Sequence, residues 1–133
     1  MNERLVPAEV DDPWEDLIVS ILAVNQYSLE KTYPLLEGLR KGGLTYPNNL
    51  AAWNPDEITA RLRESGCNRG AFMTGLFALR LCSVGVAAKA RGIEEFTRIL
   101  LSKDFAEIDR LLMSVNGIGP KVLWNFRLLQ RRT

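Results

Sequence analysis

The stretch that decides the fold lies near the C-terminal end and covers residues 112–129, LMSVNGIGPKVLWNFRLL. It places Gly117 and Gly119 one residue apart between two apolar segments. Glycine adopts positive φ angles at little steric cost, and a proline such as Pro120 is suited to the first position of a helix. The pattern therefore predicts two helices joined by a tight hairpin at residues 115–121.

The predicted hairpin is suited to binding an anion through its backbone. Amide groups near the two glycines can point toward one ligand, and the free N–H groups at the start of the next helix add a partial positive charge. Such a site contacts a phosphate without reading a base, whereas the alternative is a helix–helix turn that holds no ligand. Ile118 is expected to anchor the turn in the core. The candidate binding residues are Val115, Gly117, Ile118, Gly119, Lys121 and Val122.

The distribution of charge favours a phosphate partner more than the net charge does. The net charge is only +1. However, no acidic residue follows Asp109, whereas five Lys or Arg residues do. The first sixteen residues have the opposite balance, with six acidic residues against Arg4. A basic end is typical of a nucleic-acid partner, although a solvated tail has the same composition.

Helical signals recur along the chain, and no stretch predicts a strand. Asp12, Asn54 and Asp104 are expected N-caps, and Glu15 is expected to reach back to the start of its helix. The expected helices begin at Pro13, at Ser28 (to about Arg40, bent at Pro34), within residues 46–53, at Pro55 (ending before Gly66), after Asn68, at Ile93, after Asp104 and at Pro120. We therefore predict a compact all-α bundle of seven or eight short helices, forming one domain over residues 1–133.

Composition excludes several kinds of site. Of the 133 residues 47% are hydrophobic, and no apolar run reaches the length of about eighteen residues that predicts a membrane span. The acidic N-terminal stretch lacks the features of a signal peptide, so we expect an intracellular protein, in the cytoplasm or nucleoid or in the nucleus. Cys67 and Cys82 are the only cysteines and histidine is absent, which leaves no ligand set for zinc or an iron–sulfur cluster and no imidazole base. We therefore expect no metal site and no cofactor.

The same residues carry a family resemblance. Residues 112–129 resemble the helix–hairpin–helix of base-excision DNA glycosylases, the group of endonuclease III and 8-oxoguanine glycosylase. Residues 12–28, DPWEDLIVSILAVNQYS, are similar to the helix that opens the six-helix domain of those enzymes and ends at their DNA-inserting loop. Residues 64–71, ESGCNRGA, are similar to the segment that joins the middle helices. The resemblance follows the family's order over most of the chain and implies an endonuclease III-like fold and a role in DNA repair.

The resemblance also implies site residues and a partner. Lys121 matches the lysine that lyase members use as a nucleophile, which would form a Schiff base with the sugar and allow β-elimination; a plain phosphate contact is the alternative. Asn25, with Gln26 beside it, matches the residue that enters the gap left by a flipped nucleotide, although an Asn can also simply end a helix. The implied partner is double-stranded DNA with a lesion or an abasic site, with a cation allowed at the hairpin when DNA is bound.

The sequence departs from the family's pattern in three places. The essential aspartate of the family lies in a helix beyond the hairpin helix, whereas the twelve residues after Lys121 contain no acid. Asp109 precedes the hairpin and is not given that role. The cysteine-bound iron–sulfur domain has no counterpart, and Leu123 stands where the family has a small residue. Three alternatives follow: a reduced DNA glycosylase or AP lyase, a non-catalytic DNA-binding module that works with a protein partner supplying the missing elements, and a helical domain whose hairpin contacts protein.

Overall fold

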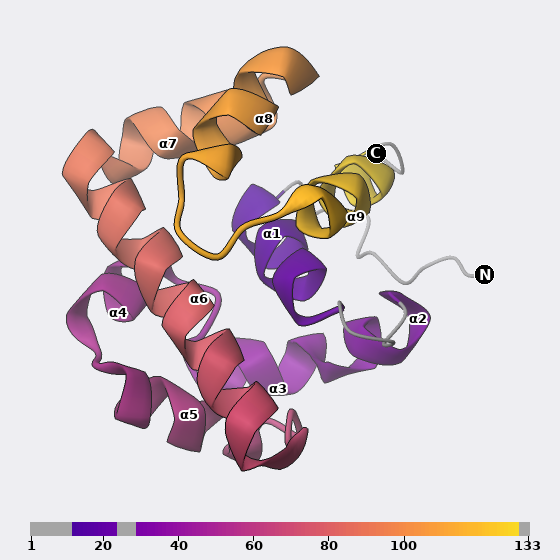
Figure 1. The fold of residues 1–133 in the computed structure, drawn as a ribbon, viewed down its shortest axis with the longest axis vertical. Coiled ribbons are helices and arrows are strands. Elements are labelled where there is room, and N and C mark those ends of the chain that lie inside the picture. Colours follow the sequence, from indigo (N-terminus) through magenta and orange to yellow (C-terminus); the bar gives the residue numbers. More distant parts are fainter. Residues whose placement is uncertain (1–11, 24–28, 131–133) are drawn as a thin grey trace.

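The fold is that of a computed structural model, which describes residues 12–23 and 29–130. All regular structure in these ranges is helical, with no strand, so the predicted all-α class is confirmed (Figure 1). The α-helices are, in chain order, α1 (Pro13–Leu22), α2 (Leu29–Thr32), α3 (Leu36–Lys41), α4 (Pro47–Ala52), α5 (Pro55–Glu64), α6 (Gly70–Arg91), α7 (Ile93–Leu101), α8 (Phe105–Met113) and α9 (Pro120–Gln130), and the 3₁₀ helix η1 (Tyr33–Leu35) lies between α2 and α3.

Side-chain caps begin three of the helices where the sequence predicted them. The side chains of Asp12, Asn54 and Asp104 accept hydrogen bonds from first-turn backbone amides at 2.9, 2.8 and 3.2 Å. The expectation for Glu15 is wrong. Its carboxylate accepts hydrogen bonds from Nε and Nη2 of Arg40 in α3, at 2.6 and 2.8 Å, because Glu15 is buried at the start of α1 and the guanidinium offers two parallel donors.

The helix predicted up to Arg40 is divided instead of merely bent. Over residues 29–41 the chain forms α2, then η1 around Pro34, then α3. Proline has no N–H to donate and its ring clashes with the preceding turn, which explains the tighter 3₁₀ segment at this point. The described ranges therefore contain nine α-helices, and not the seven or eight that were predicted.

α6 is the central helix of the bundle, with 22 residues, and it packs against α4 and α5 (Figure 1). Phe77 and Leu81 lie fully buried on its inner face. Gly85 allows the close approach of α4, since a Cβ at this position would lie 2.5 Å from backbone atoms of Leu50 and Ala51. The apolar core extends from α1 to α9 around this contact.

By length and composition α6 is also apolar enough to cross a membrane. The sequence analysis expected no membrane span because no uninterrupted apolar run is long enough. The mean hydropathy of α6 is nevertheless high, because such an average tolerates an occasional polar residue. Core helices of helical bundles pass the same test, and seven residues of α6 are buried here. Core packing accounts for the apolar character of that inner face.

Buried polar side chains join α1 to α9, which lie side by side (Figure 1). Gln130 Nε2 donates to Asp16 Oδ2 at 2.7 Å, and the Tyr33 hydroxyl donates to Asp16 Oδ1 at 3.2 Å. Asn125 Nδ2 donates to the backbone oxygen of Ser20 at 3.2 Å. Burial raises the pKa of Asp16 to about 6, against the opposing effect of the two hydrogen bonds. These contacts fix α9, and with it the turn that precedes α9, against the first helix.

Candidate nucleic-acid interface

The predicted hairpin at residues 115–121 joins α8 to α9, and its apolar residues are buried as expected. Val115, Ile118 and Val122 expose only 3%, 6% and 3% of their surface. The Ile118 amide donates to the Val115 carbonyl at 3.2 Å and closes the turn. Gly117 and Lys121 lie on the exposed side. The turn is therefore held from inside while its outer edge faces solvent.

The outer edge of the hairpin offers unpaired backbone donors. The amides of Gly119 and Lys121 have no acceptor among the residues that the structure describes. The Gly119 carbonyl accepts from the amides of Val122 and Leu123 at 3.1 and 3.3 Å, and these two bonds begin α9. The first turn of α9 contains no acidic side chain. Free amides at a helix N-terminus carry partial positive charge, so this edge is suited to an anion approaching from solvent.

The two hairpin glycines differ in their backbone conformation. Gly117 has a φ of 92°, which favours glycine. Gly119 has no positive φ, so only Gly117 uses the conformation that glycine makes available at both positions. The physical reason is Pro120, because the residue before a proline prefers an extended conformation. A Cβ at Gly119 would meet no atom within 4 Å, so the space beside its amide is open.

Arg80 of α6 lies against the hairpin and was missed by the sequence analysis. A Cβ built on Gly117 would lie 2.8 Å from Cγ of Arg80. The guanidinium carbon of Arg80 lies 5.8 Å from the centre of the Phe77 ring. Its Nε is buried and has no hydrogen-bond partner in the described part of the chain. A buried donor without an acceptor is costly, so Arg80 would gain from a shift of its side chain toward an anion at the hairpin.

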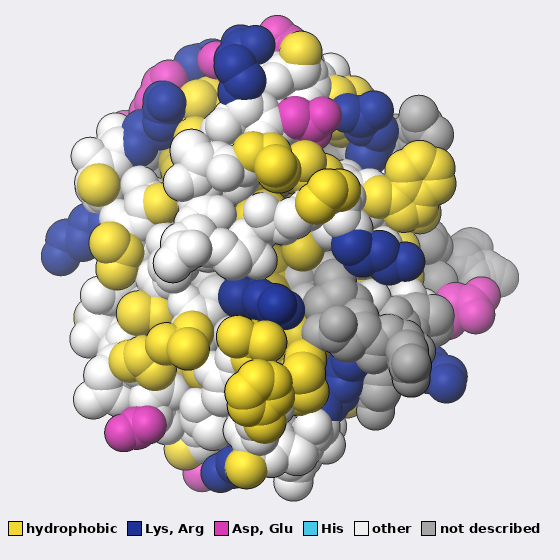
Figure 2. Space-filling view, viewed as in Figure 1, with side chains coloured by type: hydrophobic (Ala, Val, Ile, Leu, Met, Phe, Trp, Pro, Cys, Tyr) yellow, Lys and Arg dark blue, Asp and Glu magenta, His cyan; other side chains and the backbone are white. Residues whose placement is uncertain are grey.

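Arg69 extends this positive charge from the hairpin to the end of α1. Its guanidinium carbon lies 4.9 Å from the centre of the Phe77 ring, and its Nη1 donates to the Leu22 carbonyl at 2.8 Å. Arg80 and Arg69 thus form a row between the hairpin and the end of α1, with the buried Phe77 ring beneath both guanidinium groups. Figure 2 shows several Lys and Arg side chains, set apart from one another, on one face of the molecule. Arg69 and Arg80 are eleven residues apart, about three helical turns, so a helix through this region places them on the same side. This spacing is the sequence signal that could have identified the pair.

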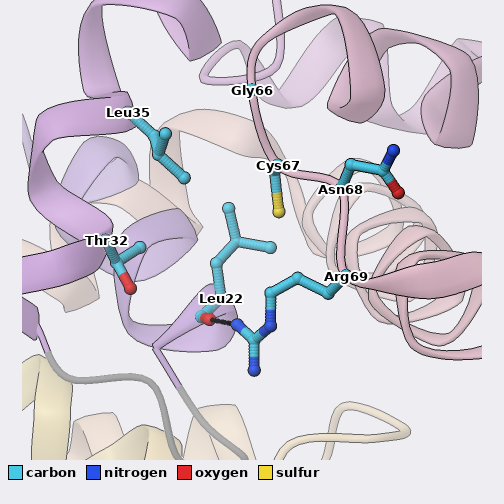
Figure 3. A pocket seen from close by; sticks show the side chains of 7 residues that line it. All are labelled: Leu22, Thr32, Leu35, Gly66, Cys67, Asn68 and Arg69. Atoms are coloured by element: carbon cyan, nitrogen blue, oxygen red, sulfur yellow. Dashed lines mark hydrogen bonds between the residues drawn. The ribbon is translucent and has the colours of Figure 1, made fainter.

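A small hollow lies at the Arg69 end of this row (Figure 3). It is lined by Leu22, Thr32, Leu35, Gly66, Cys67, Asn68 and Arg69. Its volume of about 10 Å³ is close to that of one water position, so it has no room for a nucleobase. The Arg69 side chain reaches across to Leu22, whereas Asn68 points away from the hollow (Figure 3). Burial raises the pKa of the Cys67 thiol, which keeps this thiol protonated.

Lys121 is exposed on the first turn of α9 and forms no ion pair with the described residues. Burial, one of the means by which a lysine amine is activated, is absent at this position. Asp109, the carboxylate nearest in sequence before the hairpin, accepts from Arg127 Nη2 at 2.8 Å. Trp124, three residues after Lys121, exposes 57% of its surface and was missed by the sequence analysis. Trp124 follows the buried Val122 by two positions, which places it on nearly the opposite side of α9. This helical spacing could have identified Trp124 as an exposed side chain.

Two further predictions concern the residues expected to insert into DNA and the expected absence of a metal site. Asn25 and Gln26 lie outside the described residues, within the range 24–28 between α1 and α2. Within the described ranges, no group of three or more Cys, Asp or Glu side chains is placed to hold a metal ion.

Comparisons of this sequence with protein-family models and with curated proteins find no match, and no solved structure matches the fold. Assignment of a function therefore depends on the amides, cations and exposed side chains of the α8–α9 turn and its neighbours.

Proposed function

We propose that the protein binds double-stranded DNA through its phosphate backbone, as a protein of the base-excision repair glycosylase and AP-lyase type. The observation that carries the proposal is the contact between the hairpin and Arg80. The free amides of Gly119 and Lys121 lie on the hairpin, and Arg80, whose buried Nε has no partner among the described residues, packs against the same hairpin at Gly117. In this proposal residues 105–130 are the helix–hairpin–helix of an endonuclease III-like fold.

The length of the charged row favours DNA over a small anion. A single phosphate would need only the hairpin amides, whereas the cations continue through Arg80 and Arg69 to the end of α1. A nucleic-acid strand presents phosphates in succession, so a row of donors and cations can contact several of them. Hydrogen bonds of this kind position the protein without specifying a sequence, which suits recognition of damage in any sequence context.

Lys121 supplies the chemistry in this proposal, and the inferred substrate is an abasic site. The amine would add to the C1′ aldehyde of the opened sugar, expel water and form a Schiff base, from which β-elimination breaks the strand on the 3′ side. Base excision demands more, because a carboxylate must stabilise the charge that develops on the sugar. No acid follows Asp109 in the sequence, and Asp109 is held by Arg127. An abasic site avoids that step, since its base has already gone.

DNA binding is tested by fluorescence anisotropy with a short labelled duplex, with and without an abasic site, over a series of salt concentrations. We expect the logarithm of Kd to rise linearly with the logarithm of salt concentration. Arg80→Ala should weaken binding about tenfold, because it removes a charge-assisted contact. The matched control is Arg98→Ala, whose exposed arginine pairs with Glu95 on α7. Binding that does not depend on salt, or an equal loss in both variants, would contradict the proposal.

A further inference from the structure

The outer face of α6 carries large apolar side chains in a regular pattern. Phe72, Leu79 and Val86 are seven residues apart and expose 79%, 52% and 54% of their surface. The residues that complete the pattern, four positions after each, are Leu76, Ser83 and Ala90. Alternating steps of four and three residues are the heptad pattern by which one helix packs along another. We call the six residues the heptad face.

None of the described elements covers the heptad face. Two open hollows of about 350 Å³ each lie along it, on either side of Leu79. The first is bordered by Phe72 and Gly75 of α6 and by Asp56 of α5. The second is bordered by Val86 and Ala90 of α6 and by residues 114–116. Figure 2 shows hydrophobic side chains exposed along α6, and an apolar surface of this kind is typical of a site of association.

We propose that the heptad face binds a second copy of this chain, with the two α6 helices antiparallel about a two-fold axis near residue 81. In that register Phe72 packs opposite the partner's Ala90, Leu76 opposite the partner's Val86, and Leu79 opposite the partner's Ser83. Each layer combines a large side chain with a smaller one. A parallel pair would place Phe72 opposite Phe72 and Ala90 opposite Ala90, with crowding at one end and a gap at the other. The size gradient along one helix therefore selects the antiparallel arrangement.

The charges beside the heptad face agree with the same register. Lys89 is exposed and lies within one turn of Val86 and Ala90, which border the second hollow. Asp56 is exposed and borders the first hollow beside Gly75. Gly75 has no side chain that would separate Asp56 from the partner. The two-fold axis exchanges the two hollows, so Lys89 of each copy approaches Asp56 of the other. Opposite charges at these positions favour this pairing over shifted registers.

Sedimentation equilibrium on the full chain tests the proposal. We expect a concentration-dependent dimer. Phe72→Glu should raise the dimer Kd about 100-fold, because two anchors are lost per dimer and each contributes a factor of about ten. Since Phe72 is 79% exposed, this variant should keep the helicity of the parent in circular dichroism. Leu101→Glu, at a 43% exposed residue on α7, is the matched control and should dimerise like the parent.

The register is tested by exchanging the charges. Lys89→Glu should weaken the dimer, and the double variant with Asp56→Lys and Lys89→Glu should restore it. A parent that stays monomeric at all concentrations overturns the proposal. So does an equal effect of Leu101→Glu and Phe72→Glu, or a double variant no better than Lys89→Glu. A monomer that binds phosphatidylserine vesicles, and loses this binding in Phe72→Glu, overturns it in favour of a membrane surface.

Discussion

Arg80 and Gly117 are in direct contact, although 37 residues separate them in the sequence: a Cβ on Gly117 would lie 2.8 Å from Cγ of Arg80. The contact joins the middle of α6 to the turn before α9. It packs the aliphatic part of the Arg80 side chain against the hairpin, and it requires residue 117 to have no side chain. The φ of 92° at Gly117 imposes the same requirement independently.

The two hairpin glycines should respond differently to substitution. Gly117→Ala should lower the free energy of unfolding by about 1–2 kcal/mol, because alanine is strained at this φ. Gly119→Ala should leave stability nearly unchanged, since its Cβ meets no atom within 4 Å, but should weaken DNA binding because the methyl group stands beside the free amide. Urea denaturation and anisotropy measure the two effects separately. If Gly119→Ala binds DNA like the parent, the Gly119 amide is not a phosphate contact.

The two glycines inside α6 offer a second matched pair. Gly85→Ala should destabilise the protein by about 3 kcal/mol, since the added Cβ would lie 2.5 Å from the α4 backbone, which is not free to move aside. Gly75→Ala should stabilise it by about 0.5–1 kcal/mol, because the site is open and alanine is the better helix former. Thermal or urea unfolding at one low protein concentration measures both. Equal effects of the two substitutions would show that α4 is not packed closely on Gly85.

Asp16 should make stability fall as the pH rises from about 4 to about 7. Burial raises its pKa to about 6 from 3.8, so the folded chain holds this proton more tightly than the unfolded chain. Its contribution is therefore complete below about pH 4 and is lost as the pH rises through about 6. The shift corresponds to at most about 3 kcal/mol. Asp16→Asn does not ionise, so the difference in unfolding free energy between variant and parent should grow with pH over this interval. A difference in unfolding free energy that stays constant with pH would contradict a raised pKa of Asp16 in the folded chain.

Lys121 should form a covalent adduct with abasic DNA through its Schiff base. Borohydride reduces a Schiff base to a stable bond, so a labelled abasic duplex should remain attached to the protein in a denaturing gel. Lys121→Ala should abolish the adduct, whereas Lys41→Ala, at an exposed lysine of α3, should not change it. Salt-dependent binding without an adduct would identify a non-catalytic DNA-binding module. An adduct that survives Lys121→Ala would assign the reaction to another amine.

Local signals predicted the tight turn between α8 and α9 and the starts of most helices correctly. The caps at Asp12, Asn54 and Asp104 form because an acceptor side chain there meets amides only two or three residues away. Burial of Ile118 follows from an isoleucine between two glycines in a turn with apolar helices on both sides. The two glycines alone did not predict that only Gly117 adopts a positive φ, although the cause at Gly119, Pro120, is also a neighbour.

The contacts of Arg69 and Arg80 lay beyond such signals. Their contacts with Phe77 lie within or beside α6, but the contact of Arg80 with Gly117 and the hydrogen bond from Arg69 to the Leu22 carbonyl exist only once α6 lies beside the hairpin and the end of α1. Glu15 illustrates the same point: a local cap was available to its carboxylate, but the guanidinium of Arg40 offered two strong donors from another helix. A tertiary partner outweighed a local one.

The amino-acid sequence alone determined that this chain is helical, where most of its helices begin, and that a tight apolar-anchored turn precedes the last one, because these properties depend on residues within one or two turns of each other. Only the tertiary structure decided which side of α6 is buried. α6 is apolar on both sides, so its periodicity does not distinguish the face that packs on α4 and α5 from the face with Phe72, Leu79 and Val86. The close approach of α4 at Gly85 makes that choice, and it leaves the heptad face outside.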